Sequence, residues 1–141
     1  MNIRRKMLAV AGGTAMVVVG LMSPALAEGS FQSYMSNWGV GKESRTWQDN
    51  NTDSTNGYAQ FRKCREVPAY DFKIGVYKED SGPDTQMALK WVDCVNQSAA
   101  PPGGWPRIYF GDVPKDQYHF TLKDVHTVGQ RIDVDLVNVS Y

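Results

Sequence analysis

The sequence predicts an all-β protein, an antiparallel β-sandwich of about seven or eight strands with one disulfide. Three observations support this class. Apolar and polar residues alternate with period two in several runs, which is the pattern of strands that face a core on one side. Turn-forming residues separate the runs. Beyond residue 27, no stretch carries the 3.6-residue apolar stripe of an amphipathic helix.

Four runs show the alternation most clearly. Their apolar sets are Phe72, Ile74 and Val76; Met87, Leu89 and Trp91; Tyr118, Phe120 and Leu122; and Ile132, Val134 and Leu136. We expect these sets to face the core, with Tyr118 as an ordinary half-buried tyrosine in preference to a tyrosine corner. After Leu136 the apolar set changes to Val137, Val139 and Tyr141. This change of face predicts a β-bulge near Leu136-Val137.

Residues 1–27 have the organisation of a secretory signal peptide. Arg4, Arg5 and Lys6 precede an uncharged apolar run that continues to about Leu21, and Ala25-Leu26-Ala27 forms an A-x-A cleavage site. The run is interrupted by small and polar residues, so a membrane-spanning helix of roughly 20 apolar residues is not expected. We therefore expect an exported, extracellular protein.

The charge of the remaining chain argues against some partners. The first 27 residues hold three of the 15 basic residues and none of the 15 acidic ones, so residues 28–141 have 12 basic against 15 acidic residues, a net charge of −3. Proteins that bind nucleic acid or anionic membranes usually have a basic excess. No such partner is expected. The 114 residues after the signal fit one domain, with a sandwich over 42–141 and an N-terminal arm or edge strand over 28–41.

Cys64 and Cys94 are the only cysteines. Two cysteines in an exported chain usually form a disulfide. Whether the bond joins two sheets or two neighbouring strands stays open. A metal site would need more ligands of this kind than the chain offers.

No motif predicts catalysis, so neither an enzyme nor a cofactor is expected. His119 and His126 are the only histidines, and no G-x-S-x-G motif accompanies them. His119 is expected on the outer face of its strand, and His126 in a loop near Asp124. The oxygen-bearing residues of Asp49–Ser54 resemble the start of a calcium-binding loop, and Asn50–Thr55 (NNTDST) loosely resembles the calcium-binding loop of microbial βγ-crystallins. A polar turn is the preferred interpretation, and no metal site is predicted.

Trp38, Trp47, Trp91 and Trp105 are many tryptophans for a chain of this length. Trp47 and Trp91 are expected in or near the core, and Trp38 and Trp105 are the best candidates for exposure. Exposed tryptophans stack on sugar rings. A carbohydrate- or cell-wall-binding domain that uses Trp105, Tyr109 and Phe110 is therefore the alternative function.

The segment from Glu28 to Trp38 is polar with interleaved apolar residues, and Gly39-Val40-Gly41 follows it. An aromatic arm before a glycine hinge suits strand donation to a partner. We therefore predict Phe31, Tyr34, Met35 and Trp38 as partner-binding residues. A plain edge strand or a frayed terminus is the alternative. A separable arm would leave the thermal transition nearly unchanged when residues 28–37 are deleted.

Three short stretches carry a resemblance to a known family. They are Ser30–Tyr34 (SFQSY), Gly41–Asp49 (GKESRTWQD) and Asp53-Ser54-Thr55, with Cys64 downstream. They resemble the small exported adaptor subunits of Streptomyces-type umbrella toxin particles. The resemblance implies a β-rich, disulfide-bearing adaptor that joins a lectin-like subunit to a large repeat-containing toxin polypeptide. It also implies that residues 28–37 dock into the lectin-like subunit. The leading expectation is thus a secreted, non-catalytic module that binds other secreted proteins.

Overall fold

The computed structural model describes residues 29–65, 71–94 and 99–141. The predicted signal peptide at 1–27 lies outside these ranges. The described part consists of strands, turns and loops, and it holds no helix long and apolar enough to cross a membrane.

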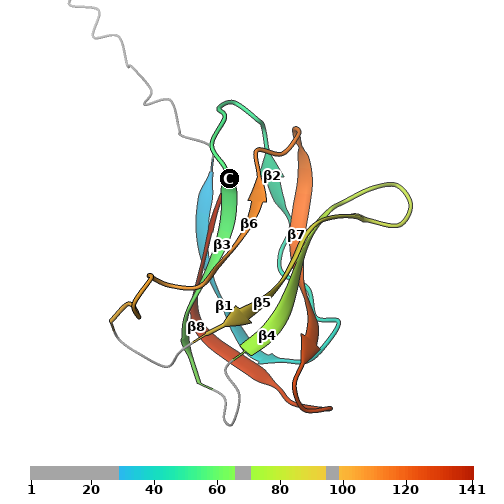
Figure 1. Cartoon of the computed structure of the whole chain (residues 1–141). Coiled ribbons are helices and arrows are strands. Elements are labelled where there is room, and N and C mark those ends of the chain that lie inside the picture. Colours follow the sequence, from blue (N-terminus) through green and yellow to red (C-terminus); the bar gives the residue numbers. More distant parts are fainter. Residues whose placement is uncertain (1–28, 66–70, 95–98) are drawn as a thin grey trace, which may run out of the picture.

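Eight strands form two antiparallel four-stranded sheets, in the orders β1-β8-β3-β6 and β2-β7-β4-β5. Their bounds are β1 (Ser30–Trp38), β2 (Trp47–Asp49), β3 (Gly57–Cys64), β4 (Asp71–Lys78), β5 (Thr85–Asp93), β6 (Arg107–Gly111), β7 (Asp116–Val125) and β8 (Ile132–Ser140). The sheets enclose one core to which both contribute. Figure 1 shows the strands wrapped around this core, with the β4–β5 turn projecting to one side. The predicted all-β sandwich is confirmed.

Strands β3 and β8 form the middle of the first sheet, and their side chains alternate between the core and the outer face. Ala59 and Phe61 on β3 pair with Val139 and Val137 on β8, and all four are buried. The buried set of β8 changes phase between Val134 and Val137, and the register with β1 shifts at the same place. This is the face change that the apolar pattern of the C-terminus predicts.

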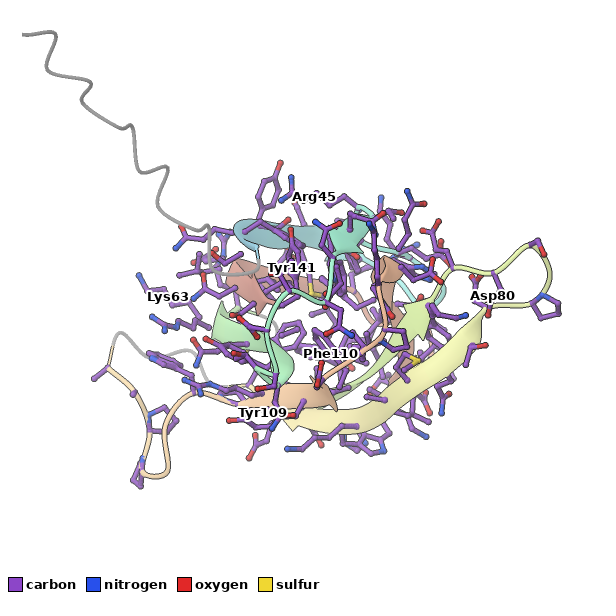
Figure 2. All side chains as sticks on the ribbon, turned by 90° about the horizontal axis from the view of Figure 1, so that it is seen from above. Arg45, Lys63, Asp80, Tyr109, Phe110 and Tyr141 are labelled. Atoms are coloured by element: carbon purple, nitrogen blue, oxygen red, sulfur yellow. A yellow bond between two sulfur atoms is a disulfide. The ribbon has the colours of Figure 1, made fainter. Side chains whose placement is uncertain are left out.

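Trp47 on β2 connects the two sheets through ring contacts at one end of the core. Its ring lies 5.7 Å from Phe31, 5.9 Å from Phe110 and 6.0 Å from Tyr141, which belong to the first sheet or follow it. It also stacks on Tyr118 of β7 at 6.3 Å. Figure 2 shows Phe110 and Tyr141 turned into this interior, whereas Tyr109, next to Phe110 on β6, lies on the outside.

The disulfide joins the sheets at the other end of β3. Cys64 ends β3 in the first sheet, Cys94 directly follows β5 in the second, and their Cα atoms are 5.8 Å apart. The predicted pairing is confirmed, and of the two arrangements left open the bond between sheets is the one present. The bond closes a loop with a sequence separation of 30 residues. For such a loop the chain-entropy description gives about 3.6 kcal/mol of stabilisation.

Strand β5 does not face the core as its apolar pattern predicts. Leu89 and Trp91 are 41% and 38% exposed, whereas Val92 is buried. The period of two correctly identifies a strand, but it does not determine which face turns inward. Trp91 is partly covered on the outer face by the imidazole of His126, which stacks on it at 4.9 Å.

Strand β1 is an edge strand of the first sheet, hydrogen-bonded to β8. Phe31, Met35 and Trp38 are 9%, 1% and 7% exposed, so three of the four predicted partner-binding side chains belong to the core. Trp38, expected to be exposed, stacks on Phe120 at 5.6 Å. Tyr34 is 68% exposed and lies at the surface.

Tyr118 is fully buried rather than half-buried. Its hydroxyl donates a hydrogen bond to the Pro114 carbonyl, with 2.5 Å between the oxygens. This contact to the backbone four residues upstream has the form of a tyrosine corner. Burial, followed by the negative charges of Asp116, Asp49 and Asp80, raises the pKa of Tyr118 to about 12.

The burial of β1 predicts that this strand stabilises the fold. Met35→Ala removes a side chain that is 1% exposed, so we expect the free energy of unfolding to fall by about 2–5 kcal/mol. Urea denaturation measures this loss. Ser36→Ala, at the exposed neighbouring position, is the matched control and should change stability by less than about 0.5 kcal/mol. Equal effects of the two changes would contradict the buried position of Met35.

The raised pKa of Tyr118 predicts a loss of stability at high pH. Below pH 10 the phenol is neutral in both folded and unfolded chains. Between pH 10 and 12 the unfolded chain loses this proton first, so the free energy of unfolding should fall by about 2–3 kcal/mol across this window. Ion pairing with Asp80 raises the pKa of Lys78, so its stabilisation also declines at high pH. The test therefore compares the free energy of unfolding of the wild type and of Tyr118→Phe as the pH rises. The variant has no phenol to titrate, so its stability should fall less between pH 10 and 12.

Candidate functional site

The outer face of sheet β1-β8-β3-β6 carries polar side chains in two rows that cross the strands. Backbone pairing places the members of each row side by side. The first row is Gln32, Asn138, Gln60 and Arg107, and the second is Ser30, Ser140, Tyr58 and Tyr109. Because alternate residues of a strand point to opposite faces, the same strands send apolar side chains into the core and these rows outward.

A hollow of about 510 Å³ lies over the two rows. We call it the sheet groove. Its polar lining includes Gln32, Gln60, Arg62, Arg107 and Asn138, and Tyr58 adds an aromatic ring. The volume falls within the range of about 300–1,000 Å³ that is usual for small-ligand sites.

The floor of the sheet groove contains polar atoms without a partner. Gln60 is 2% exposed, and its Oε1 accepts hydrogen bonds from Arg62 Nε at 2.9 Å and Nη2 at 2.6 Å, and from Asn138 Nδ2 at 3.5 Å. Gln60 Nε2, Asn138 Oδ1 and Arg107 Nε are shielded from solvent and have no hydrogen-bond partner among the described residues. Leaving such a group unpaired costs about 1–3 kcal/mol, so the floor has unused capacity both to donate and to accept.

Aromatic rings hold the cationic side chains of the groove in place. The Arg107 guanidinium lies 4.6 Å from the centre of the Tyr58 ring, and its Nη1 donates to the Tyr109 hydroxyl at 3.3 Å. The Tyr58 and Tyr109 rings are 5.9 Å apart. A guanidinium stacked on a ring loses less freedom when a ligand binds.

A second hollow of about 340 Å³ lies beside the first and shares Arg107 with it. We call it the loop hollow. The Pro102–Pro106 segment forms one wall, and Lys90 and Tyr109 complete it. Gly103 and Gly104 have positive φ angles of 87° and 86°, a conformation that favours glycine. This turn brings Trp105 toward the sheet, where Arg62 lies 5.3 Å from its ring centre.

The structure brings together two of the three aromatic residues predicted for glycan binding. Trp105 and Tyr109 both line the loop hollow, and Tyr109 is 55% exposed. Phe110 is 6% exposed and belongs to the core, because it is the neighbour of Tyr109 on β6 and points the opposite way. Phe110 is therefore not part of the surface on which a glycan was predicted to bind.

Sequence reasoning missed Gln32, Gln60, Arg62, Arg107 and Asn138. In the sequence these residues are visible only as polar positions that alternate with the apolar positions of a strand. Most polar residues in such positions face water and bind nothing, so the pattern alone does not identify a site. Only the register between strands shows that four of them form one row.

The two histidines lie on the outer face of the other sheet, each beside carboxylates. His119 is 4% exposed, with Nδ1 3.5 Å from Glu79 and Nε2 3.8 Å from Glu43. His126 Nε2 contacts Asp71 Oδ2 at 2.5 Å rather than Asp124. Within residues 29–65, 71–94 and 99–141, no hydrogen bond joins either imidazole to a hydroxyl or thiol.

The carboxylates of the Asp49–Ser54 segment hold a polar turn. Asp49 Oδ1 accepts the Asn51 backbone N–H at 2.7 Å, and Asp53 Oδ1 accepts that of Thr55 at 2.6 Å. Hydrogen bonding to Thr55 lowers the pKa of Asp53. Across the described part of the chain, no group of three His, Cys, Asp or Glu residues is placed to hold a metal ion.

Comparison with protein-family models, curated proteins and solved structures finds no match for this chain. The case for function therefore depends on the geometry of the sheet groove and the loop hollow.

Proposed function

We propose that this chain is an exported, non-catalytic carbohydrate-binding domain whose ligand lies in the sheet groove. The observation that carries the proposal is the row of Gln60, Asn138 and Arg107, each with a shielded polar atom that finds no partner in the described part of the chain. All three line one hollow on the outer face of a rigid sheet.

The unpaired atoms suit hydroxyl groups. Asn138 Oδ1 is an acceptor, whereas Gln60 Nε2 and Arg107 Nε are donors. A hydroxyl both donates and accepts, so a sugar can supply partners of both kinds once small side-chain rotations open the floor. A ligand that only donated or only accepted would leave one kind of atom unpaired.

The aromatic groups also suit a sugar. Tyr58 is half-buried in the sheet groove, and Tyr109 and Trp105 stand in the neighbouring loop hollow. Rings with an apolar face and a polar edge bind ligands that are themselves amphipathic. Polar floor groups give orientation while aromatic walls add apolar contact, which is the usual division in small-ligand sites.

The test is glycan-array screening of the oxidised protein, followed by calorimetry with the best ligand. Asn138→Ala removes one floor amide, and we expect the Kd to rise about fivefold to tenfold, as for one lost hydrogen bond. Gln86→Ala on β5 of the other sheet is the matched control and should leave the Kd unchanged. An array with no bound glycan would sink the proposal, and so would equal effects of the two variants.

A second candidate function is capture of another secreted protein along the free edge of β1. One observation favours it. The nine residues of β1 include no charged residue and no proline, although exposed edges are usually protected by such residues. Tyr34, 68% exposed on this strand, would be the anchor. A partner strand could then extend the sheet. The resemblance to toxin-particle adaptors separately implies that residues 28–37 dock into a lectin-like subunit.

Affinity purification from the native culture medium, with mass spectrometry, tests this candidate. We expect a lectin-like subunit to co-purify with the wild type, and Tyr34→Ala to weaken its capture by about tenfold or more, as at an interface hot spot. Tyr109→Ala is the control: it should weaken glycan binding but not protein capture. Unchanged capture by Tyr34→Ala would count against pairing at this edge.

A further inference from the structure

The cationic side chains around the two hollows have no acidic counterpart there. Arg62 and Arg107 line the sheet groove, Arg107 and Lys90 line the loop hollow, and neither lining includes Asp or Glu. Residues 28–141 carry more acidic than basic residues, so their net charge is negative. The surface around the two hollows is positive and therefore differs from the protein as a whole. A local field of this kind attracts anionic ligands.

These cations are not engaged by described carboxylates. Arg62 donates to Gln60 and stacks over Trp105, and Lys90 Nζ donates to the Arg107 backbone carbonyl at 3.1 Å. None of the three cations forms an ion pair within the described ranges. Among the described residues no carboxylate pairs with them, so their charges remain available to an anionic ligand.

Arg107 stands where the hollows meet and belongs to both linings. Its Nε is shielded and has no partner within the described ranges, and its guanidinium is held by the Tyr58 ring and the Tyr109 hydroxyl. Once a small side-chain rotation uncovers the Nε–H, the planar guanidinium presents the fork that binds a carboxylate or sulfate through two oxygens. Two hollows in succession suit a ligand made of linked units.

We infer that the ligand is an acidic oligosaccharide, with a carboxylate or sulfate group bound by Arg107 between the sheet groove and the loop hollow. This inference rests on the proposed function and adds the charge of the ligand, its extension over two subsites and the residue that selects it. Arg62 and Lys90 supply the flanking positive field.

The experiment compares glycans matched in everything but charge. An array carries uronate, sialylated and sulfated glycans beside neutral ones, and calorimetry then compares oligogalacturonate with the methyl-esterified oligomer of equal length, and a sulfated glycan with its desulfated form. We expect the acidic member of one pair to bind about tenfold more tightly or better. This preference should shrink as salt is raised, because the cations are partly exposed.

Arg107→Gln should bring the ratio between acidic and neutral ligands close to one, and Arg62→Gln should reduce it. Lys115→Gln, which removes an exposed cation before β7, is the charge-matched control and should leave the ratio unchanged. Circular dichroism of each variant verifies folding. Tighter binding of the neutral member in both pairs would overturn the acidic ligand while leaving the carbohydrate-binding function in place. Binding of no glycan of either kind would overturn both.

Discussion

The register between β3 and β8 determines both the core and the candidate site. In this register Ala59 pairs with Val139 and Phe61 with Val137 on the inner face, while Gln60 pairs with Asn138 on the outer face. A shift of one residue would send the amides inward and the apolar side chains out to water. The free energy that stabilises the core therefore also fixes Gln60 and Asn138 at the centre of the polar row, and pairing with β1 and β6 adds Gln32 and Arg107.

Contacts at both ends of β3 keep this register rigid. At its start, the Phe110 ring lies so close to Gly57 that a Cβ there would stand 2.0 Å from the ring; Phe110 in turn contacts Trp47 from the other sheet. At its end, Cys64 is bonded to Cys94. The strand that carries Tyr58, Gln60 and Arg62 is thus attached to the opposite sheet on either side of the groove. A rigid support of this kind lowers the entropy lost when a ligand binds.

The class of fold was predictable from the sequence, because alternation, turn residues and two cysteines are local signals. The sequence was a poorer guide to which face of a strand turns inward and to which strands lie side by side. Alternation in Met87–Val92 identified a strand but assigned Leu89 and Trp91 to the wrong face, since an edge strand can leave apolar side chains half-exposed. The sequence suggests a partner-binding arm that contains Phe31, Met35 and Trp38, yet pairing of this strand with β8 buries all three side chains. Of the residues that line the two hollows, only Trp105 and Tyr109 were predictable, because a tryptophan or tyrosine in a loop or on a strand is by itself a candidate for glycan binding. Gln32, Gln60, Arg107 and Asn138 become a site only when their four strands are aligned.

The composition of the groove floor is difficult to explain by stability alone. Gln60, Asn138 and Arg107 each have one shielded polar atom without a partner among the residues that the structure describes. Each unpaired atom costs roughly 1–3 kcal/mol, which is large beside the roughly 5–15 kcal/mol that stabilises a typical domain. Apolar residues, or residues whose polar atoms all find partners, would avoid this cost at the same places. Local departures from the most stable choice concentrate where a protein binds something. When a ligand with hydroxyl and anionic groups enters, it forms hydrogen bonds with these atoms. The free energy that the free protein loses by leaving them unpaired therefore allows the groove to select a ligand that pairs with them.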